Sequence, residues 1–424
     1  MRPPPPHRAT TARLQAAYPF VSEGGIGSEG PLIGRDVMGG SFCFDPWVLY
    51  RRGVLTNPNL IVMGQVGRGK STFVKTFVWR QMAFGRQSWV IDPKGEYGPL
   101  AHACATTPLR LSPGGPQRLN PLDMPAAKAD SDAAAMERPR ADLVASLVSS
   151  SLARRLLPAE RAAVDLAVIG ASRRSEPPTL GAVVEAMLEP DADLAASVNT
   201  DAAGLAADGR APALELRRLV GGDLAGMFDG RTATCAVDLD APLVTLDLSR
   251  VFSSPALPLL MTCAISWMQS ALARADGVKR LVVIDEAWAV LHDLSTARWL
   301  QSVFKLSRAF GVSNVAVVHR LSDLRSAGAE GSSQQQLAEG LLSDSETRVV
   351  FGQPISEAGV TAEMVGLTGV ERDVVAHLPR GVALWKVGDR SFLVEHLVGG
   401  METEIVDTDS AMLDSAPEAE QVAR

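Results

Sequence analysis

The stretch NLIVMGQVGRGKSTF, residues 59–73, decides the fold. It contains the complete pattern G-x-x-x-x-G-K-[ST], directly after the apolar run LIVM and before the helical-looking STFVKTFVWRQM. This context predicts a phosphate-binding loop, because glycines let backbone N–H groups curl around phosphates at the start of a helix. The alternative is a glycine-rich strand-to-helix turn that binds nothing, and the strand and helix on either side argue against it.

The loop predicts a nucleotide and a metal ion. Lys70 would supply charge to the β and γ phosphates, and Ser71 would ligate Mg²⁺. No [NT]KxD-type reader of a guanine base occurs, so we expect ATP and Mg²⁺ as cofactors. The residues expected to bind the nucleotide here are Gly64, Gln65, Val66, Gly67, Arg68, Gly69, Lys70, Ser71 and Thr72.

A pair of acids follows a second apolar run. In RLVVIDEAW, a buried strand would deliver Asp285 to its carboxyl end, where the carboxylate can hold the magnesium water shell. Glu286 comes next, and an acid at this position can polarise an attacking water. The pair therefore predicts ATP hydrolysis, the alternative being two exposed acids at a strand end.

Apolar runs rich in β-branched residues recur along the chain. Continuous apolarity predicts strands covered on both faces, and helical-looking segments lie between the runs. We therefore predict an α/β fold, the doubly wound, RecA-like sheet of a P-loop NTPase with an inserted all-α subdomain. Two alternating runs around Gly388-Asp389 predict a hairpin at the edge of the sheet. The continuous runs are 60–63, 89–91, 243–246, 281–284, 315–318 and 349–351.

Composition divides the chain into segments. Residues 1–44 are expected to be a flexible leader rich in proline and arginine, and 45–124 with 229–400 to form a discontinuous ATPase core. The segment 125–228 is rich in alanine and leucine and has helical spacing, as in TLGAVVEAML, so we expect an all-helical insertion. The acidic segment 401–424 is expected to be disordered.

Charge and cysteine content exclude few classes of protein function. Of the net charge of -7, the last 23 residues carry seven acids and one arginine, so the rest is near neutral and argues neither for nor against DNA binding. Four isolated cysteines predict neither a zinc site nor a disulfide framework. The start lacks the apolar region of a signal peptide, and the longest apolar run, 256–268, is too short to span a membrane. We expect a cytoplasmic protein that reaches the membrane only through partners.

A third motif indicates which class of phosphate-loop ATPase the sequence resembles. The run SWVIDPKGEYGPL places D-P-K-G-E-Y, residues 92–97, after the strand that follows the first helix. This order resembles the FtsK/HerA superfamily of DNA-pumping ATPases, and in particular the conjugation and type IV secretion ATPases of the VirB class. RLNPLD, LAGMFDGRT, DLSRV and VIDEAWAVL extend the resemblance over roughly residues 45 to 400. LSPGGPQ, by contrast, lies too far upstream of Asp285 for a transporter signature.

The resemblance implies roles for particular residues. Lys70 would act on phosphate, Asp285 on the metal, and Glu286 as the catalytic base. Asp92 would orient the site from the neighbouring strand end, the alternative being that it caps the P-K-G-E-Y turn. Such motors usually work as rings of six in which a neighbour supplies an arginine; Arg308 is the first candidate and Arg348 the second, while an exposed helical arginine is the alternative for Arg308.

The chain also departs from the family pattern. A threonine-glutamine sensor pair commonly follows the strand at 315–318, where this chain has His319-Arg320. About 44 residues precede the expected core, fewer than the family's large amino-terminal partner-binding domain needs, so we expect either that this domain is a separate chain or that the docking mode is different. We expect an ATP-hydrolysing motor, a hexameric homo-oligomer working with membrane-embedded proteins of a conjugation or type IV secretion system, that energises DNA or protein transfer. The alternatives are a translocase acting directly on duplex DNA, and a nucleotide-gated assembly factor with little turnover.

Overall fold

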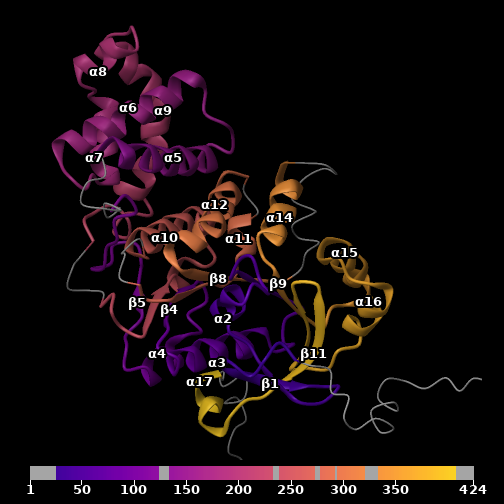
Figure 1. The fold of residues 1–424 in the computed structure, drawn as a ribbon. Helices are drawn as coiled ribbons and strands as arrows, with labels where there is room; N and C mark the ends of the chain where they lie inside the picture. Colours follow the sequence, from indigo (N-terminus) through magenta and orange to yellow (C-terminus); the bar gives the residue numbers. More distant parts are fainter. Residues whose placement is uncertain are drawn as a thin grey trace, which may run out of the picture.

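The computed structural model describes residues 25–123, 133–232, 238–272, 277–291, 294–319 and 333–406. A large central sheet carries helices on both faces, and a further group of helices stands to one side of it (Figure 1). This arrangement confirms the predicted α/β class.

The described residues form one sheet of eleven strands, in the order β2-β1-β11-β10-β9-β3-β8-β7-β4-β6-β5. From β9 to β5 all neighbours are parallel, whereas from β9 to β2 they are antiparallel. Each predicted apolar run lies in a parallel strand. The strands are β1 (Leu32–Asp36), β2 (Ser41–Cys43), β3 (Leu60–Met63), β4 (Gln87–Asp92), β5 (Leu109–Arg110), β6 (Leu243–Asp247), β7 (Arg280–Ile284), β8 (Val312–Val318), β9 (Thr347–Phe351), β10 (Val382–Val387) and β11 (Arg390–His396).

Helices follow the parallel strands and cover both faces of the sheet. Helix α3 lies on one face, and α10 and α12 lie on the other (Figure 1). The helices are α2 (Pro46–Arg51), α3 (Lys70–Met82), α4 (Gly98–Ala103), α5 (Ala133–Ser151), α6 (Pro158–Arg174), α7 (Leu180–Leu188), α8 (Ala192–Ser197), α9 (Ala202–Val220), α10 (Leu257–Leu272), α11 (Trp288–Leu291), α12 (Leu294–Phe310), α14 (Ser333–Ser343), α15 (Ile355–Val365), α16 (Gly369–Val375) and α17 (Thr403–Val406), with 3-10 turns at Ser249–Val251 and Gly400–Glu402.

Continuous apolar strands are needed because successive side chains of a strand point to opposite faces. In β3, Leu60 and Val62 join the hydrophobic core that contains Phe73 of α3, whereas Ile61 and Met63 join the core built with α10 and α12. The sheet is thus buried on both sides.

Helices α5 to α9 lie between β5 and β6 in the sequence and form the group beside the sheet (Figure 1). Thr179 caps α7, since its hydroxyl accepts a hydrogen bond from the Ala182 N–H at 3.2 Å. The apolar face of α7 is buried against α6 and α9, and α5 packs on α10 and α12. Among the described residues this segment contains no strand.

Both ends of the core extend further than we predicted. Strands β1 and β2 lie within the predicted leader, and β1 pairs with β11, so the hairpin β10-β11 lies inside the sheet and not at its edge. At the other end, Glu402 lies within the predicted disordered tail but is buried and forms an ion pair with Arg80 at 2.5 Å. These boundaries are therefore wrong, because pairing between distant segments orders short stretches that show no local signal.

Helix α10 contains nearly all of the apolar run 256–268 and packs in the core, and no helix in the described ranges is long and apolar enough to cross a membrane. Cys43, Cys104 and Cys263 are free thiols, whereas Cys235 lies outside the described residues.

The last residue of β11, His396, lies in an aromatic cluster. Its ring stacks on Phe73 with 4.7 Å between centroids, and its Nε2 accepts a hydrogen bond from Trp385 Nε1 at 2.9 Å. Its Nδ1 is buried and has no hydrogen-bonding partner among the described residues. Burial, with a smaller effect of the Arg80 charge, lowers the pKa of His396 to about 3.

We expect mild acid to destabilise the protein through His396. The unfolded chain takes up the proton near pH 6.5 and the folded chain only near pH 3, so the stability is present above pH 6.5 and is lost as pH falls toward 3. Between pH 6.5 and 5 the loss should be about 1.5 kcal/mol. Urea unfolding at both pH values should show a smaller loss for His396→Phe, and an equal loss in both proteins would contradict the assignment.

Candidate active site

The phosphate-binding loop joins β3 to α3. Gly64, Gly67 and Gly69 have φ values of 150°, 77° and 107°, a region that glycine enters at little cost. A Cβ on Gly64 would lie 2.6 Å from the Cβ of Phe351, so only glycine lets the loop pass β9. Gly69, the N-cap of α3, supplies no side-chain cap, which leaves the first turn of the helix suited to an anion.

Lys70 points back into the loop. Its Nζ donates to the carbonyl oxygens of Gly64 at 2.6 Å and Gln65 at 3.1 Å. Burial lowers the pKa of Lys70 to about 8, while the charges of Glu286 and Asp285 oppose that shift. The two motifs, far apart in the sequence, therefore share one site.

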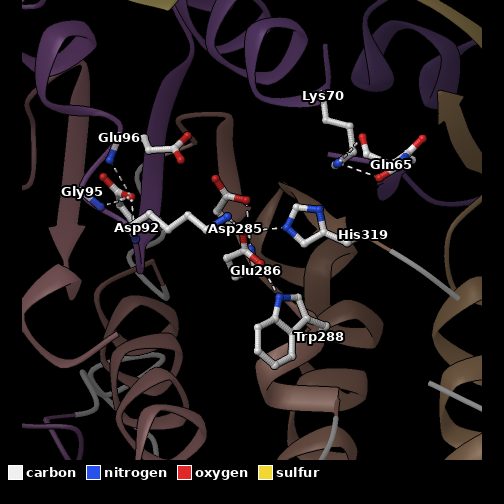
Figure 2. A network of polar contacts seen from close by, with 11 residues as sticks. Gln65, Lys70, Asp92, Gly95, Glu96, Asp285, Glu286, Trp288 and His319 are labelled. Atoms are coloured by element: carbon white, nitrogen blue, oxygen red, sulfur yellow. Dashed lines mark hydrogen bonds and ion pairs between the residues drawn. The ribbon is translucent and has the colours of Figure 1, made fainter. Parts of the chain in front are cut away.

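The second motif follows β7, as predicted. Asp285 and Glu286 are 6% and 3% exposed, which contradicts the alternative of an exposed acidic strand end. Burial, followed by the charges of Glu286 and Asp92, raises the pKa of Asp285 to about 7. Figure 2 shows Asp285, Glu286 and His319 between Lys70 with Gln65 on one side and Asp92 on the other.

Glu286 adopts a backbone conformation that is unusual for a residue with a side chain, with φ of 52°. Its carboxylate forms an ion pair with Lys94, accepts a hydrogen bond from the Trp288 indole, and contacts His319 Nε2 at 2.8 Å (Figure 2). Burial alone would raise the pKa of Glu286, but the hydrogen bonds from His319 and Lys94 lower it to about 2. The carboxylate is thus an anion with a fixed orientation.

Asp92 shapes the turn after β4. Its Oδ1 accepts from the backbone N–H groups of Lys94, Gly95 and Glu96 at 3.2, 2.8 and 3.1 Å, and its Oδ2 accepts from that of Tyr97 at 2.9 Å. Burial raises the pKa of Asp92 to about 6. Because both oxygens are engaged by the turn, the geometry favours the capping interpretation over direct contact with a nucleotide.

The two candidate arginines differ in their exposure and in their contacts. Arg308 lies exposed near the end of α12, and within the described ranges its guanidinium makes no hydrogen bond or ion pair. Arg348 instead donates to the carbonyl oxygens of Leu342 and Val365, each at 3.0 Å, and burial lowers its pKa. Arg348 is therefore held within its own chain, which contradicts its role as an arginine supplied to a neighbour.

The structure brings into the site two residues to which we assigned no role, Lys94 and Trp288. Both lie inside recognised motifs, D-P-K-G-E-Y and I-D-E-A-W. The motifs therefore marked the two residues, but nothing in the sequence showed that they would contact Glu286. His319, the first residue of the altered sensor pair, contacts Glu286, whereas Arg320 lies outside the described residues.

This topology and site define the fold class of the P-loop NTPases. More particularly, the structure is similar to that of VirB4 of Thermoanaerobacter pseudethanolicus, with a TM-score of 0.71 and 20% sequence identity over 90% of this chain and 100% of that one. It is also similar to the plasmid coupling protein TrwB. The complex of TrwB with ADP and Mg²⁺ gives a TM-score of 0.56 and 14% identity, covering 80% of this chain and 86% of that one. The complex with a non-hydrolysable ATP analogue gives 0.55 and 14%, covering 80% and 85%. No protein-family model and no curated protein matches the sequence.

Proposed function

We propose that this chain is an ATP-hydrolysing motor of a bacterial conjugation or type IV secretion system, which energises the transfer of DNA or protein across the envelope. The observation that carries the proposal is one site in which the phosphate-binding loop with Lys70 lies beside the buried acids Asp285 and Glu286 (Figure 2). The likeness to VirB4 over 90% of the chain supports the choice of system.

The residues present fit ATP and Mg²⁺. The backbone of Gly64 to Gly69 and the first turn of α3 would hold the phosphates, and Ser71 and Asp285 would hold the metal ion. Mg²⁺ is usually held by one or two protein oxygens, and the Ser71 hydroxyl and the Asp285 carboxylate are ligands of that kind. When bound, Mg²⁺ supplies charge that offsets developing negative charge on phosphate oxygens.

Side chains of the protein itself would bind the phosphates and accept the proton. Lys70 is already buried in the loop and would exchange its contacts with Gly64 and Gln65 for phosphate oxygens. Glu286 would accept a hydrogen bond, and then a proton, from the attacking water. Within the described part of the chain, no arginine contacts either acid, so we propose that a second copy of the chain completes the site through Arg308 in a homo-oligomeric ring.

The proposal is tested by ATP turnover as a function of protein concentration, with and without double-stranded and single-stranded DNA. Turnover should rise as the protein assembles. Strong stimulation by duplex DNA would instead favour a translocase acting on DNA, and absence of turnover would favour a nucleotide-gated assembly factor.

Lys70→Ala should abolish that turnover by weakening nucleotide binding. The variant loses charge-assisted hydrogen bonds to phosphate, so affinity for ATP should fall by roughly 10-fold or more. A fluorescent-nucleotide titration measures this loss. Lys386→Ala is a matched control, because Lys386 pairs with Glu371 outside the site. Unchanged affinity in Lys70→Ala would exclude the loop as the phosphate site.

A further inference from the structure

The turn after β4 has a tightly defined shape. The Asp92 carboxylate accepts hydrogen bonds from the backbone N–H groups of four consecutive residues of this turn, 94–97. Gly95, within the turn, has a φ of 75°. A Cβ on Gly95 would lie 3.1 Å from the Cβ of Ser249, so the turn packs closely against the 3-10 turn Ser249–Val251 that follows β6. The position of the Lys94 backbone is therefore fixed by the fold.

The Lys94 side chain reaches from this turn to Glu286. Its Nζ forms an ion pair with Oε1 of Glu286 and lies 5.8 Å from the centre of the Phe252 ring. Burial alone would lower the pKa of Lys94, but its hydrogen bond to Glu286 and the Glu286 charge raise it. Lys94 thus brings a positive charge to a carboxylate that is only 3% exposed, and a buried carboxylate is costly without such a partner.

Donors from three separate segments hold the carboxylate of Glu286. Oε1 contacts Lys94 Nζ and His319 Nε2, and Oε2 accepts from Trp288 Nε1. A carboxylate has about four acceptor sites, so one site on Oε2 remains for a further donor such as a water. The φ of 52° at Glu286 is a conformation that persists only when its surroundings hold it.

We propose that Lys94 is a positioning residue for Glu286. Together with His319 and Trp288, Lys94 holds the Glu286 carboxylate so that a single acceptor site faces the attacking water. This inference rests on the proposed function, because it takes Glu286 as the catalytic base. It also explains the D-P-K-G-E-Y motif, since Asp92 folds the turn and the turn delivers Lys94 to the acid on the neighbouring strand end.

The test compares Lys94→Met, which removes the ammonium but keeps an unbranched stem, with Lys94→Arg, which keeps the charge. Lys94→Met should lower kcat by roughly 10- to 100-fold, as loss of an orienting partner does. The KM for ATP and the affinity for a fluorescent ATP analogue, measured without turnover, should change by less than about 3-fold, because Lys94 acts through Glu286 and not on binding. Lys94→Arg should recover most of the loss, and Lys386→Met should match the unmodified chain.

A double-variant cycle decides whether Lys94 acts through Glu286. In a Glu286→Gln background, Lys94→Met should change single-turnover rates by less than about 3-fold, since the oriented base is already gone. An equal loss in both backgrounds would overturn the inference, as would unchanged kcat in Lys94→Met or a fall in nucleotide affinity that parallels kcat. If Lys94→Met does not fold, a Lys94→Arg variant with the low turnover expected of Lys94→Met would overturn the inference as well.

The same cycle separates this inference from the proposed function. If Glu286→Gln keeps its turnover, the assignment of the base is wrong, and the role of Lys94 falls with it. If Glu286→Gln is inactive while Lys94→Met is fully active, only the role of Lys94 is wrong.

Discussion

ATP turnover by a Glu286→Gln variant is expected to fall by roughly 10²- to 10⁴-fold, the usual contribution of a positioned general base. The amide of glutamine cannot accept the proton of the attacking water. Nucleotide affinity should persist, because the loop residues and Lys70 are unchanged. The variant should therefore bind ATP and retain it, and its oligomer should be stable.

The measurement pairs steady-state turnover with a filter assay of retained radiolabelled ATP. Glu395→Gln is the matched control, because Glu395 lies exposed in β11 and pairs with Arg35 outside the site. That control should keep turnover within about 3-fold, as is usual for a substitution outside the machinery. Turnover in Glu286→Gln equal to that of the unmodified chain would remove Glu286 from the chemistry.

The parallel half of the fold was predictable because its signals are local. A strand buried on both faces is mostly apolar, and the runs 60–63 and 281–284 show this directly. The antiparallel half was less visible. Strand β2 has three residues, and β1 mixes exposed and buried positions and pairs with β11, at the other end of the chain. Pairing at this distance leaves no pattern in either segment alone.

The candidate site follows the same division. The phosphate loop and the two acids are contiguous motifs whose residue types carry their chemistry. The contacts on Glu286 are only partly contiguous. Trp288 lies in the same motif as Glu286, whereas Lys94 and His319 reach it because β4 and β8 both lie next to β7 in the sheet. Sequence reasoning could place Asp92 near the site, but whether it faced a nucleotide or its own turn depended on where its two oxygens point.

Arg308→Ala is expected to lower kcat by roughly 10³-fold or more without weakening ATP binding to the isolated chain, as loss of an arginine finger does. The guanidinium is exposed and makes no ion pair or hydrogen bond within the described ranges, so its removal should leave the fold intact. Thermal unfolding should confirm that the midpoint is unchanged. Arg298→Ala is the matched control, because Arg298 is exposed on the same helix, α12, and also makes no such contact among the described residues.

Mixing two inactive variants tests whether the site is shared between copies. In a ring assembled from equal amounts of Arg308→Ala and Glu286→Gln chains, about a quarter of the interfaces join an intact Glu286 to a neighbour's intact Arg308. Turnover should therefore reappear on mixing and increase with total protein concentration. If Arg308 acted within its own chain, every site would lack either Arg308 or Glu286, and the mixture would stay as inactive as its components. Arg308→Ala chains should also recover turnover when they are mixed with Lys70→Ala chains. The Lys70→Ala chain is inactive for a different reason, and it contributes only its intact Arg308 to the neighbouring site.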